Sequence, residues 1–310
     1  MPEQKTSAAP VERAAVIFLT AETPVHAGSG NVQAALDLPI QRSVQTSWPI
    51  INDSTLRGAL RRYAEGLAGV KPEQVAKWFG AESPDNPSAG ALSSPDAEIL
   101  LFPVAAVRGM TAWVTSREAL EYFARKLGLF QSRLSAAAQA KLTELRSALD
   151  ATRAPADGEA LVTTGSAVAW EQQRKVVLEV DAYRLGDHRV DQIARWFAEN
   201  ACPHSAYWVN RIKSRIVILP EHAFKHYTLR KTDVRTRVKL ESSVVKTGPW
   251  TEENLPVDTV LYTVLAEPEG NGSLLKEFLD TIKIQDKPAL QLGGDQNLGR
   301  GFVRLRRLGA

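Results

Sequence analysis

The stretch Arg13–Ala21, RAAVIFLTA, decides how this chain folds. Its apolar run is short and rich in β-branched residues, which is typical of a buried strand. The polar, glycine-containing segment Val25–Arg42, VHAGSGNVQAALDLPIQR, follows directly. After it, Leu56 and Leu60 lie at helical spacing within Trp48–Gly69, a segment that also carries several arginines. The sequence therefore predicts a strand, a polar loop and a basic helix in that order.

Further along the chain, strand and helix signals alternate without a fixed period. Asp53 or Ser54 is expected to cap the basic helix, and Arg108-Gly109 to join two strands as a hairpin. The later elements are predicted as a helix from the cap Ser116 to about Leu127, a helix over 131–149, a strand over 175–184, a helix over Asp187–Asn200, a strand over 215–219, a short helix from Pro220, a half-exposed strand over 234–242, a strand over 260–267, a helix over 272–283, and a strand, glycine loop and strand at the C-terminus. Single helices between strands that are close enough to be antiparallel indicate an α+β fold rather than a doubly wound parallel sheet.

The composition is that of a globular protein with its own core. The chain has 310 residues, of which 44% are hydrophobic and 24% charged. No apolar run approaches the ~20 residues that span a bilayer, and the N-terminus lacks the features of a secretory signal. Cys202 is the single cysteine, which excludes an intrachain disulfide and a cysteine zinc cluster. We therefore expect a cytoplasmic protein with no membrane partner.

The net charge of +3 is modest, but its distribution is uneven. Between His204 and Lys239, nine Lys or Arg accompany only two acids, and Gln296–Ala310 holds four Arg and no acid. Clustered cations of this kind suit a polyanionic partner, because they hold phosphates. The alternative is a solvated strand face or a subunit contact.

The segment Leu292–Gly301, LGGDQNLGRG, places four glycines and one arginine between two predicted strands. Glycine lets the backbone approach a ligand closely, and exposed N–H groups in such a turn can hold phosphate oxygens. No Lys-Ser/Thr pair and no helix follows, which excludes a Walker loop and a dinucleotide fingerprint. A wide hairpin turn is the alternative interpretation.

Two further candidates lie in Val25–Arg42. The small residues after His26 resemble an anion-binding nest, although a histidine here also suits a plain turn or a core position. Asp37 stands close before a proline, where a lone carboxylate is usually a turn residue. No second acid is adjacent to it in the chain, and Glu252 and Glu253 are candidate distant partners. The HExxH, GxSxG and Cys–His ligand patterns are absent from the sequence.

Three segments together resemble the RAMP superfamily of repeat-associated CRISPR proteins. Thr23–Arg61 resembles the N-terminal signature of that family, Leu292–Phe302 its C-terminal glycine-rich loop, and Arg237–Tyr262 the thumb region of one member. The motif LDLPIQR, Leu36–Arg42, resembles that of the backbone subunit of the type III-B (Cmr) effector complex. The three segments bracket nearly the whole chain and occur in the order that the family has.

The resemblance implies a single RRM-like (ferredoxin-like) palm over residues 1–310, with helical insertions at about 80–97 and 130–165 and a β-hairpin thumb at about 240–256. It also implies that copies of the chain stack with other Cmr-complex subunits into a helical filament along a CRISPR RNA. The filament would cleave a paired target RNA at regular intervals. The catalytic aspartate of the family falls on Asp37, which would act with a divalent metal ion, Mg²⁺, as its ligand.

The other site residues are expected to hold RNA or to form the thumb. Backbone groups and cations would hold the guide through its phosphates, and apolar thumb residues would wedge against the guide–target duplex. The RNA-binding candidates are His26, Gly28, Ser29, Gly30, Arg42, Ser54, Arg57, Arg61, Gly293, Gly294, Asn297 and Arg300, and the thumb candidates are Val244, Val245 and Trp250. Packing of Trp250 on the palm is the alternative for that residue.

The chain departs from the family pattern in two places. Ser43 stands where the family often has an acid, and Asp53–Gly58 replaces the usual Gly-Ser-Ser-Leu-Lys-Gly at the helix start. Arg57 keeps the cation of that motif, whereas Asp53 adds negative charge near the expected guide. Neither departure touches Asp37.

Three alternatives stay open at this point. The first is a structural RNA-binding backbone without cleavage activity, which Asp37 argues against. The second is the equivalent subunit of a type III-A complex, which the LDLPIQR and TEENLP segments disfavour. The third is a small-molecule enzyme that binds a nucleotide in the glycine loop, and a nucleotide-binding assay would separate it from an RNA-binding protein.

Overall fold

The computed structural model describes residues 12–30, 36–81, 88–202, 205–241, 244–268, 273–284 and 289–310. None of the helices in these ranges combines the length and the apolar character that a membrane crossing requires.

The described part of the chain contains strands β1 to β14 and helices α1 to α8. The strands are β1 (Ala14–Ala21), β2 (Ile50–Ile51), β3 (Ala97–Ala106), β4 (Met110–Ser116), β5 (Glu159–Val162), β6 (Ala169–Trp170), β7 (Lys175–Leu178), β8 (Asp181–Arg189), β9 (Ile216–Leu219), β10 (Asp233–Glu241), β11 (Val244–Asn254), β12 (Val260–Ala266), β13 (Ala289–Gln291) and β14 (Phe302–Arg307). The helices are α1 (Asp53–Glu65), α2 (Pro72–Phe79), α3 (Arg117–Leu129), α4 (Ala136–Asp150), α5 (Asp191–Asn200), α6 (Ala206–Lys213), α7 (Glu221–Arg230) and α8 (Leu274–Thr281).

Four strands and two helices form the palm. The strands lie in the order β14-β1-β12-β3, and each neighbouring pair is antiparallel. Along the chain the elements run β1, α1, β3, β12, α8 and β14, so that two split β–α–β units interlock. This is the ferredoxin-like arrangement of an RRM-like palm. The predicted α+β class and palm architecture are confirmed.

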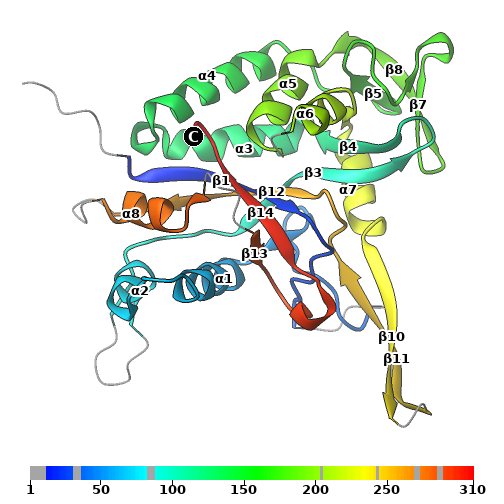
Figure 1. Cartoon of the computed structure of the whole chain (residues 1–310). Helices are drawn as coiled ribbons and strands as arrows, with labels where there is room; N and C mark the ends of the chain where they lie inside the picture. Colours follow the sequence, from blue (N-terminus) through cyan, green and yellow to red (C-terminus); the bar gives the residue numbers. More distant parts are fainter. Residues whose placement is uncertain are drawn as a thin grey trace, which may run out of the picture.

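The first strand is buried along its whole length because helices cover both faces of the sheet (Figure 1). Ile17 and Leu19 pack into the core shared with α1, α2 and α8, whereas Val16 and Phe18 pack into the core shared with α3, α4 and α5. Successive side chains of a strand point to opposite faces. A strand that is covered on both faces therefore needs the continuous apolar run seen in RAAVIFLTA.

A long insertion between β3 and β12 supplies the second helical layer. The sheet extends from β3 through β4, β9, β5, β8 and β7 to β6, and helices α3 to α6 lie over one of its faces (Figure 1). The hairpin predicted at Arg108-Gly109 joins β3 to β4. The insertion predicted at about 130–165 corresponds to α4 and β5. Within the insertion predicted at about 80–97, residues 82–87 lie outside the described residues.

The thumb is a two-stranded sheet of its own, formed by β10 and β11, and it projects away from the palm (Figure 1). It spans Asp233–Asn254 and so begins earlier than the predicted range of about 240–256. The alternation of charged and apolar residues from 234 onward predicted a half-exposed strand. In the structure that strand is the first arm of the thumb, and its Val234 and Val238 are 48% and 45% exposed.

Several element boundaries differ from those predicted, and three of these differences are instructive. Helix α1 has Asn52 at its N-cap without a side-chain cap bond, whereas Asp53 or Ser54 was expected. The predicted strand over 175–184 is broken by a turn at Glu179, whose φ is +53°. The strand after that turn, β8, continues to Arg189, so α5 begins at Asp191 and not at 187. Strand pairing with β5 and β7 thus overrides the local helix signal.

Candidate functional site

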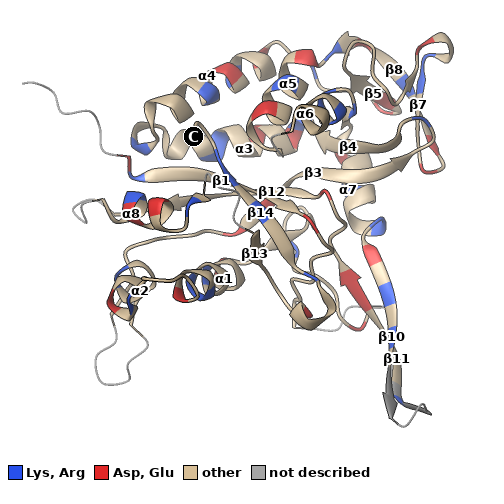
Figure 2. Ribbon diagram, in the orientation of Figure 1, with Lys and Arg blue, Asp and Glu red and all other residues tan. Residues whose placement is uncertain are grey.

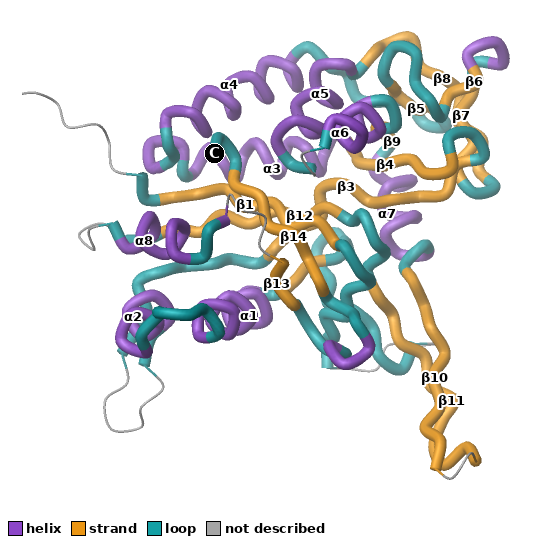
Figure 3. The backbone as a smooth tube through the Cα atoms, in the orientation of Figure 1, coloured by secondary structure: helices purple, strands orange, loops and turns teal. Residues whose placement is uncertain are grey.

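Four segments that are far apart in the chain meet at the base of the thumb, a meeting place that we call the seam. They are the loop 24–30 after β1, the strip 36–42, the thumb residues 251–255, and the glycine loop 292–301. The strip lies between the first loop and the thumb, because Gln41 N donates to Ala27 O (2.8 Å) and Leu38 N donates to Thr251 O (3.0 Å). Figure 3 shows loop segments gathered between β13–β14 and the β10–β11 hairpin.

Asp37 is exposed at this seam, and Thr251 of β11 holds its carboxylate. The backbone N–H and the hydroxyl of Thr251 both donate to Oδ2 of Asp37, at 2.7 and 2.9 Å. In return, the backbone N–H of Asp37 donates to the Thr251 hydroxyl oxygen, at 3.1 Å. The aspartate is therefore fixed in direction although its side chain stands in solvent.

The same contacts set the charge of Asp37. The Thr251 backbone N–H, and then the Thr251 hydroxyl, lower the pKa of the Asp37 carboxyl below its usual value, because both bonds favour the charged form. Asp37 is thus a carboxylate at neutral pH. An ionised, oriented and exposed carboxylate can accept a proton or bind a cation.

Glu253 anchors the strip from beneath. Its side chain is 1% exposed and forms an ion pair with Arg42. It also accepts hydrogen bonds from the backbone N–H of Ile40 (3.0 Å) and from the hydroxyl of Thr232 (2.8 Å). The other terminal guanidinium nitrogen of Arg42 donates to the backbone carbonyls of Ser47 and Thr228. As placed, Arg42 stabilises the strip, and its predicted contact with RNA stays a prediction.

Gln41 ties the strip to the start of α1. Its side-chain amide donates to Gly28 O (3.0 Å) and to the Thr55 hydroxyl (3.1 Å), and its carbonyl oxygen accepts from Asn52 N (2.6 Å). The predicted RNA-binding residue Ser54 is exposed on the adjoining first turn of α1. The N-terminus of this helix therefore opens toward the seam.

The glycine loop rests directly on the loop after β1. Gly294 N donates to His26 O (3.1 Å), and a Cβ atom at Gly293 would lie 2.0 Å from the same oxygen. Only glycine permits that approach, and Gly293 also has a φ of +75°. The imidazole of His26 donates from Nδ1 to the backbone carbonyl of Glu253 (2.7 Å), so it bridges this loop to the thumb. The two glycine motifs of the sequence are thus neighbours in space.

A buried ionic cluster joins the glycine loop to the thumb. Arg300 is 6% exposed and pairs with Glu252, which is 1% exposed. Arg237 of β10 pairs with Glu252 and, at 3.0 Å, with Asp295 of the glycine loop. Burial and the neighbouring cations lower the pKa of Arg300. Glu252 and Glu253, which the sequence left open as distant acid partners of Asp37, are therefore engaged with internal arginines.

The remaining predicted RNA-binding residues fall into two groups. Gly28, Gly30 and Asn297 are exposed, and the backbone N–H of Ser29 donates to Pro39 O (2.9 Å). Arg57 and Arg61 instead donate to backbone carbonyls in the segment at the C-terminal end of α2, at Phe79 (3.0 Å) and its C-cap Gly80 (3.1 Å). These two arginines fasten that segment to α1, and their contacts with RNA remain predictions.

The arginine excess near the C-terminus is largely used within the chain. The partners are Glu252 for Arg300, Glu22 for Arg304, the carbonyls of Cys202 and Glu199 for Arg306, and Glu12 for Arg307. Figure 2 shows basic and acidic residues interspersed over both layers. Local clustering of cations in the sequence is therefore weak support for a polyanion site, because their partners come from distant segments.

The predicted thumb residues are placed in part. Trp250 is half-buried within the hairpin, where the guanidinium of Arg237 lies 5.7 Å from the centre of its ring. Its partner across the strands is also Arg237, so it packs along the thumb. The side chains of Val244 and Val245 lie outside the described residues, and their predicted wedge role stays a prediction.

The donor set at Asp37 suits a magnesium ion held jointly with a substrate. In the described ranges, no three His, Cys, Asp or Glu side chains gather into a metal-binding group. Magnesium, however, is commonly held by one or two carboxylates together with substrate phosphates and water. The exposed, ionised Asp37 meets that need, since both Thr251 bonds go to one of its two oxygens.

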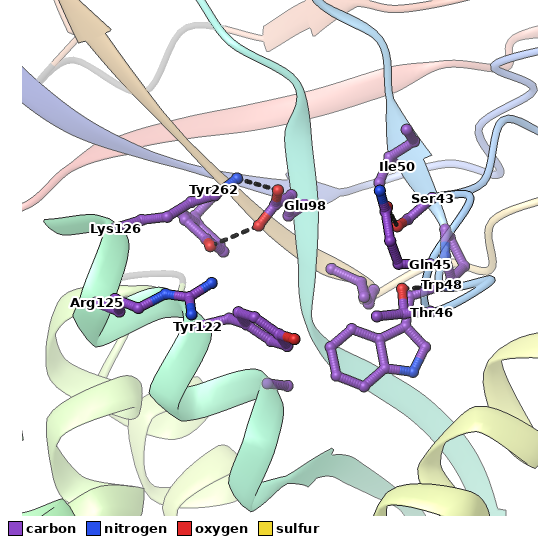
Figure 4. A pocket seen from close by; sticks show the side chains of 13 residues that line it. Ser43, Gln45, Thr46, Trp48, Ile50, Glu98, Tyr122, Arg125, Lys126 and Tyr262 are labelled. Atoms are coloured by element: carbon purple, nitrogen blue, oxygen red, sulfur yellow. Dashed lines mark hydrogen bonds and ion pairs between the residues drawn. The ribbon is translucent and has the colours of Figure 1, made fainter. Parts of the chain in front are cut away.

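A separate pocket of about 290 Å³ lies beside the loop after the strip (Figure 4). In it, the hydroxyl of Tyr262 donates to Glu98 (2.7 Å), and Lys126 pairs with the other oxygen of that carboxylate. Trp48 packs edge-on against Tyr122. None of the predicted site residues lines this pocket, and its carboxylate is already paired, so we assign it no part in the chemistry.

Sequence analysis did not single out Thr251, Gln41 or Asp295. Thr251 lies 214 residues from Asp37 in the chain, and Gln41 is an ordinary polar residue within a loop. The signals near Thr251 were the two acids of the TEEN segment and the thumb candidate Trp250, and neither pointed to the threonine. Thr251 contacts the Asp37 carboxylate because the strip pairs with the thumb, and this pairing joins segments that are distant in the sequence.

Comparison with known proteins agrees with this architecture. The profile of the RAMP superfamily matches residues 18–304. The chain is 32% identical over 301 residues to the CRISPR system Cmr endoribonuclease Cmr4 of Pyrococcus furiosus, which covers 94% of this chain and 95% of the relative. The crystal structure of oligomeric Cmr4 from Pyrococcus furiosus has a TM-score of 0.72 and 26% identity, over 95% of this chain and 98% of that one.

The fold also matches a chain in the cryo-EM structure of the type III-B Cmr-beta bound to cognate target RNA. That match has a TM-score of 0.73 at 18% identity, over 96% of this chain and 98% of the other. The resemblance carried by the three sequence segments is confirmed. The match of the family profile over residues 18–304 and the 32% identity to Cmr4 show that this chain, with its palm, projecting hairpin and glycine loop, belongs to the RAMP superfamily.

Proposed function

We propose that this chain is an RNA-guided endoribonuclease subunit that forms the backbone of a type III-B (Cmr) effector complex. The observation that carries the proposal is Asp37, an exposed carboxylate that Thr251 keeps ionised and oriented at the base of a projecting hairpin. The relatives support it, because the Cmr4 of Pyrococcus furiosus is named an endoribonuclease and has been crystallised as an oligomer. The partners would be CRISPR RNA, target RNA, other Cmr subunits and further copies of the chain, in the cytoplasm.

Guide RNA would lie along the seam. Backbone N–H groups of the loop 26–30 and of the glycine loop would face its phosphates, together with the exposed start of α1. The thumb would press into the guide–target duplex and interrupt it once per subunit. Sequence would be read by base pairing, and the protein would read backbone and shape.

Cleavage would use the nucleophile that RNA itself supplies. The 2′-hydroxyl of a target nucleotide attacks the adjacent phosphorus and its proton passes to the Asp37 carboxylate. The bond from phosphorus to the 5′-oxygen of the next nucleotide breaks, and that oxygen takes a proton from water. The products are a 2′,3′-cyclic phosphate and a 5′-hydroxyl. Asp37 would also be the protein ligand of Mg²⁺, which when bound neutralises charge on the phosphate.

The direct test assembles the chain with its partner subunits and a guide RNA, and adds a labelled complementary target. A ladder of products at a constant interval is the expected result. If the target stays intact in a complex that contains both guide and target, the chain is better explained as a structural RNA-binding backbone without cleavage activity. Partner subunits of type III-A composition in the native complex would favour that alternative assignment.

Chelation should stop cleavage and leave assembly intact. A single carboxylate adds negative charge beside a phosphate and does not neutralise it, so a divalent cation is needed. The measurement is target cleavage in excess EDTA, followed by addition of Mg²⁺, with complex size followed in parallel. Full activity in EDTA would remove the metal from the proposal.

Guide binding should depend strongly on salt and hardly at all on sequence. If the seam contacts phosphates, log K should fall linearly with log salt, by about 0.7 for each phosphate that is held. The measurement compares the natural guide with a scrambled guide of equal length over a salt series. An affinity that does not change with salt, or a clearly higher affinity for the natural guide than for the scrambled guide, would contradict binding through phosphates. Competition by free nucleotide would support the small-molecule alternative.

A further inference from the structure

Thr251, through its hydroxyl, both donates a hydrogen bond to Asp37 and accepts one from it. Its Oγ1 donates one hydrogen bond, to Asp37 Oδ2, and accepts one, from Asp37 N. Its own backbone N–H adds a second donor to the same carboxylate oxygen. A hydroxyl has one proton to donate and lone pairs to accept with, so both capacities are used on one partner residue.

We propose that Thr251 is the positioning residue for Asp37, and that the thumb sets the direction of the catalytic carboxylate through it. The inference rests on the proposed catalytic role of Asp37. It adds that the carboxylate is not an independent loop residue, because its orientation is determined by the strand from which the thumb projects.

The backbone around the pair makes this coupling rigid. Leu38 N donates to Thr251 O (3.0 Å), and Glu253 N donates to Leu38 O (3.0 Å), so the residue after Asp37 is held to β11 on both sides of Glu252. Asp37 itself is exposed, and the described structure shows no packing that would otherwise restrict its side chain. Free rotation about χ1 and χ2 would spread the carboxylate over several positions, and the Thr251 hydroxyl selects one of them.

Threonine suits this task better than other hydroxyl residues. Its β-branched side chain has few χ1 rotamers in a strand, so the hydroxyl is itself held in place. Serine keeps the hydroxyl and loses that restriction. Valine keeps the shape and loses both hydrogen bonds, although the backbone N–H of residue 251 still reaches the carboxylate.

The hairpin offers a matched control. Thr236 of β10 lies directly opposite Thr251, and directly opposed residues place their side chains on the same face. Thr236 is exposed, and no hydrogen bond of its hydroxyl is found in the part of the chain that the structure describes. Replacing Thr236 by Val makes the same chemical change on the same face without touching Asp37.

The experiment measures single-turnover cleavage at saturating target in the assembled complex, together with the Kd for target. Thr251→Val should slow cleavage by about 10- to 100-fold, the size of effect expected when a catalytic group is misplaced by about 1 Å. The Kd should not change. Thr251→Ser should retain most of the rate, and Thr236→Val, on the same thumb face but without a contact to Asp37, should slow cleavage far less than Thr251→Val.

A second comparison covers the case in which valine disturbs the hairpin. Thr251→Ser and Thr251→Ala differ by one oxygen atom, so a loss confined to alanine assigns the effect to the hydroxyl. In crystals of the two variants without RNA, the Asp37 side chain should occupy one rotamer with serine and several with alanine. This readout does not depend on activity.

The outcomes separate this inference from the proposed function. An Asp37→Asn complex that still cuts would refute the catalytic role, whatever Thr251 does. An inactive Asp37→Asn complex, combined with unchanged rates for Thr251→Val and Thr251→Ala, would refute the positioning role alone. Equal losses in Thr251→Val and Thr236→Val would also refute it, because the effect would then belong to the thumb surface.

Discussion

Replacing Asp37 by Asn is expected to slow target cleavage by about 10²- to 10⁴-fold, the range that a positioned proton acceptor contributes, while guide and target binding persist. The substitution keeps the size of the side chain and removes the charge. Because Asp37 is exposed, the palm loses no packing. The bonds from Leu38 N to Thr251 O and from Glu253 N to Leu38 O are backbone contacts and remain. The measurement is single-turnover cleavage with binding followed on the same samples.

The matched control is Asp157→Asn, which makes the same change at a side chain that is 94% exposed and remote from the seam. It should cut at the normal rate, which shows that loss of one surface charge is not enough. If Asp37→Asn cuts as fast as this control, Asp37 is not the catalytic group. If Asp37→Asn also fails to bind target, the carboxylate has a binding role, and the cleavage proposal loses its basis.

The palm could be predicted from the sequence because its strands carry their own signal. β1 is buried at every position and Thr20 is its one polar residue, and β12 is likewise buried at every position and mostly apolar. Ser116 caps α3 as expected, with its side chain accepting from Ala119 N. Signals of this kind are local, so a single sequence contains them. The order of the strands in the sheet came from the resemblance to a family and not from the pattern.

The seam could be predicted only in part, because its contacts join distant segments. The two glycine motifs, His26 and Asp37 were singled out by residue type, and the structure brings all of them to the base of the thumb. The roles of Arg42 and Arg300 were not foreseen. Each was interpreted as a phosphate contact, and each is paired with a buried glutamate, 211 residues away for Arg42. No local pattern distinguishes an arginine that meets RNA from one that meets Glu253.

The two neighbouring glutamates illustrate how the seam is built. Glu252 faces the glycine loop through Arg300 and Arg237, and Glu253 faces the strip through Arg42. Adjacent strand residues point in opposite directions, so one dipeptide fastens two loops to the thumb. A buried carboxylate is stable only when it is paired and hydrogen-bonded. The glycine loop therefore supplies an arginine to Glu252, and the strip supplies an arginine to Glu253. The position of the strip that carries Asp37 thus depends on the buried carboxylate of Glu253.

Glu253→Ala is expected to destabilise the chain by about 3–5 kcal/mol, the usual effect of removing one partner from a buried ion pair. It leaves the Arg42 guanidinium buried without its counter-charge and the backbone N–H of Ile40 and the hydroxyl of Thr232 without an acceptor. The free energy of unfolding in urea measures the effect on the isolated chain. Cleavage should fall as well, because the strip that carries Asp37 loses its anchor.

Two comparisons test whether the loss comes from the buried pair. Glu22→Ala breaks the Arg304–Glu22 pair, whose side chains are 34% and 38% exposed, and it should cost at most about 1 kcal/mol. The double variant Arg42→Met with Glu253→Met removes both charges together and should recover much of the stability, since an uncompensated charge causes most of the damage. A loss for Glu253→Ala no larger than that for Glu22→Ala would contradict the anchor role. Recovery of stability in the double variant without recovery of cleavage would show that the strip needs the directed bonds of Glu253, beyond the neutralised charge, to present Asp37.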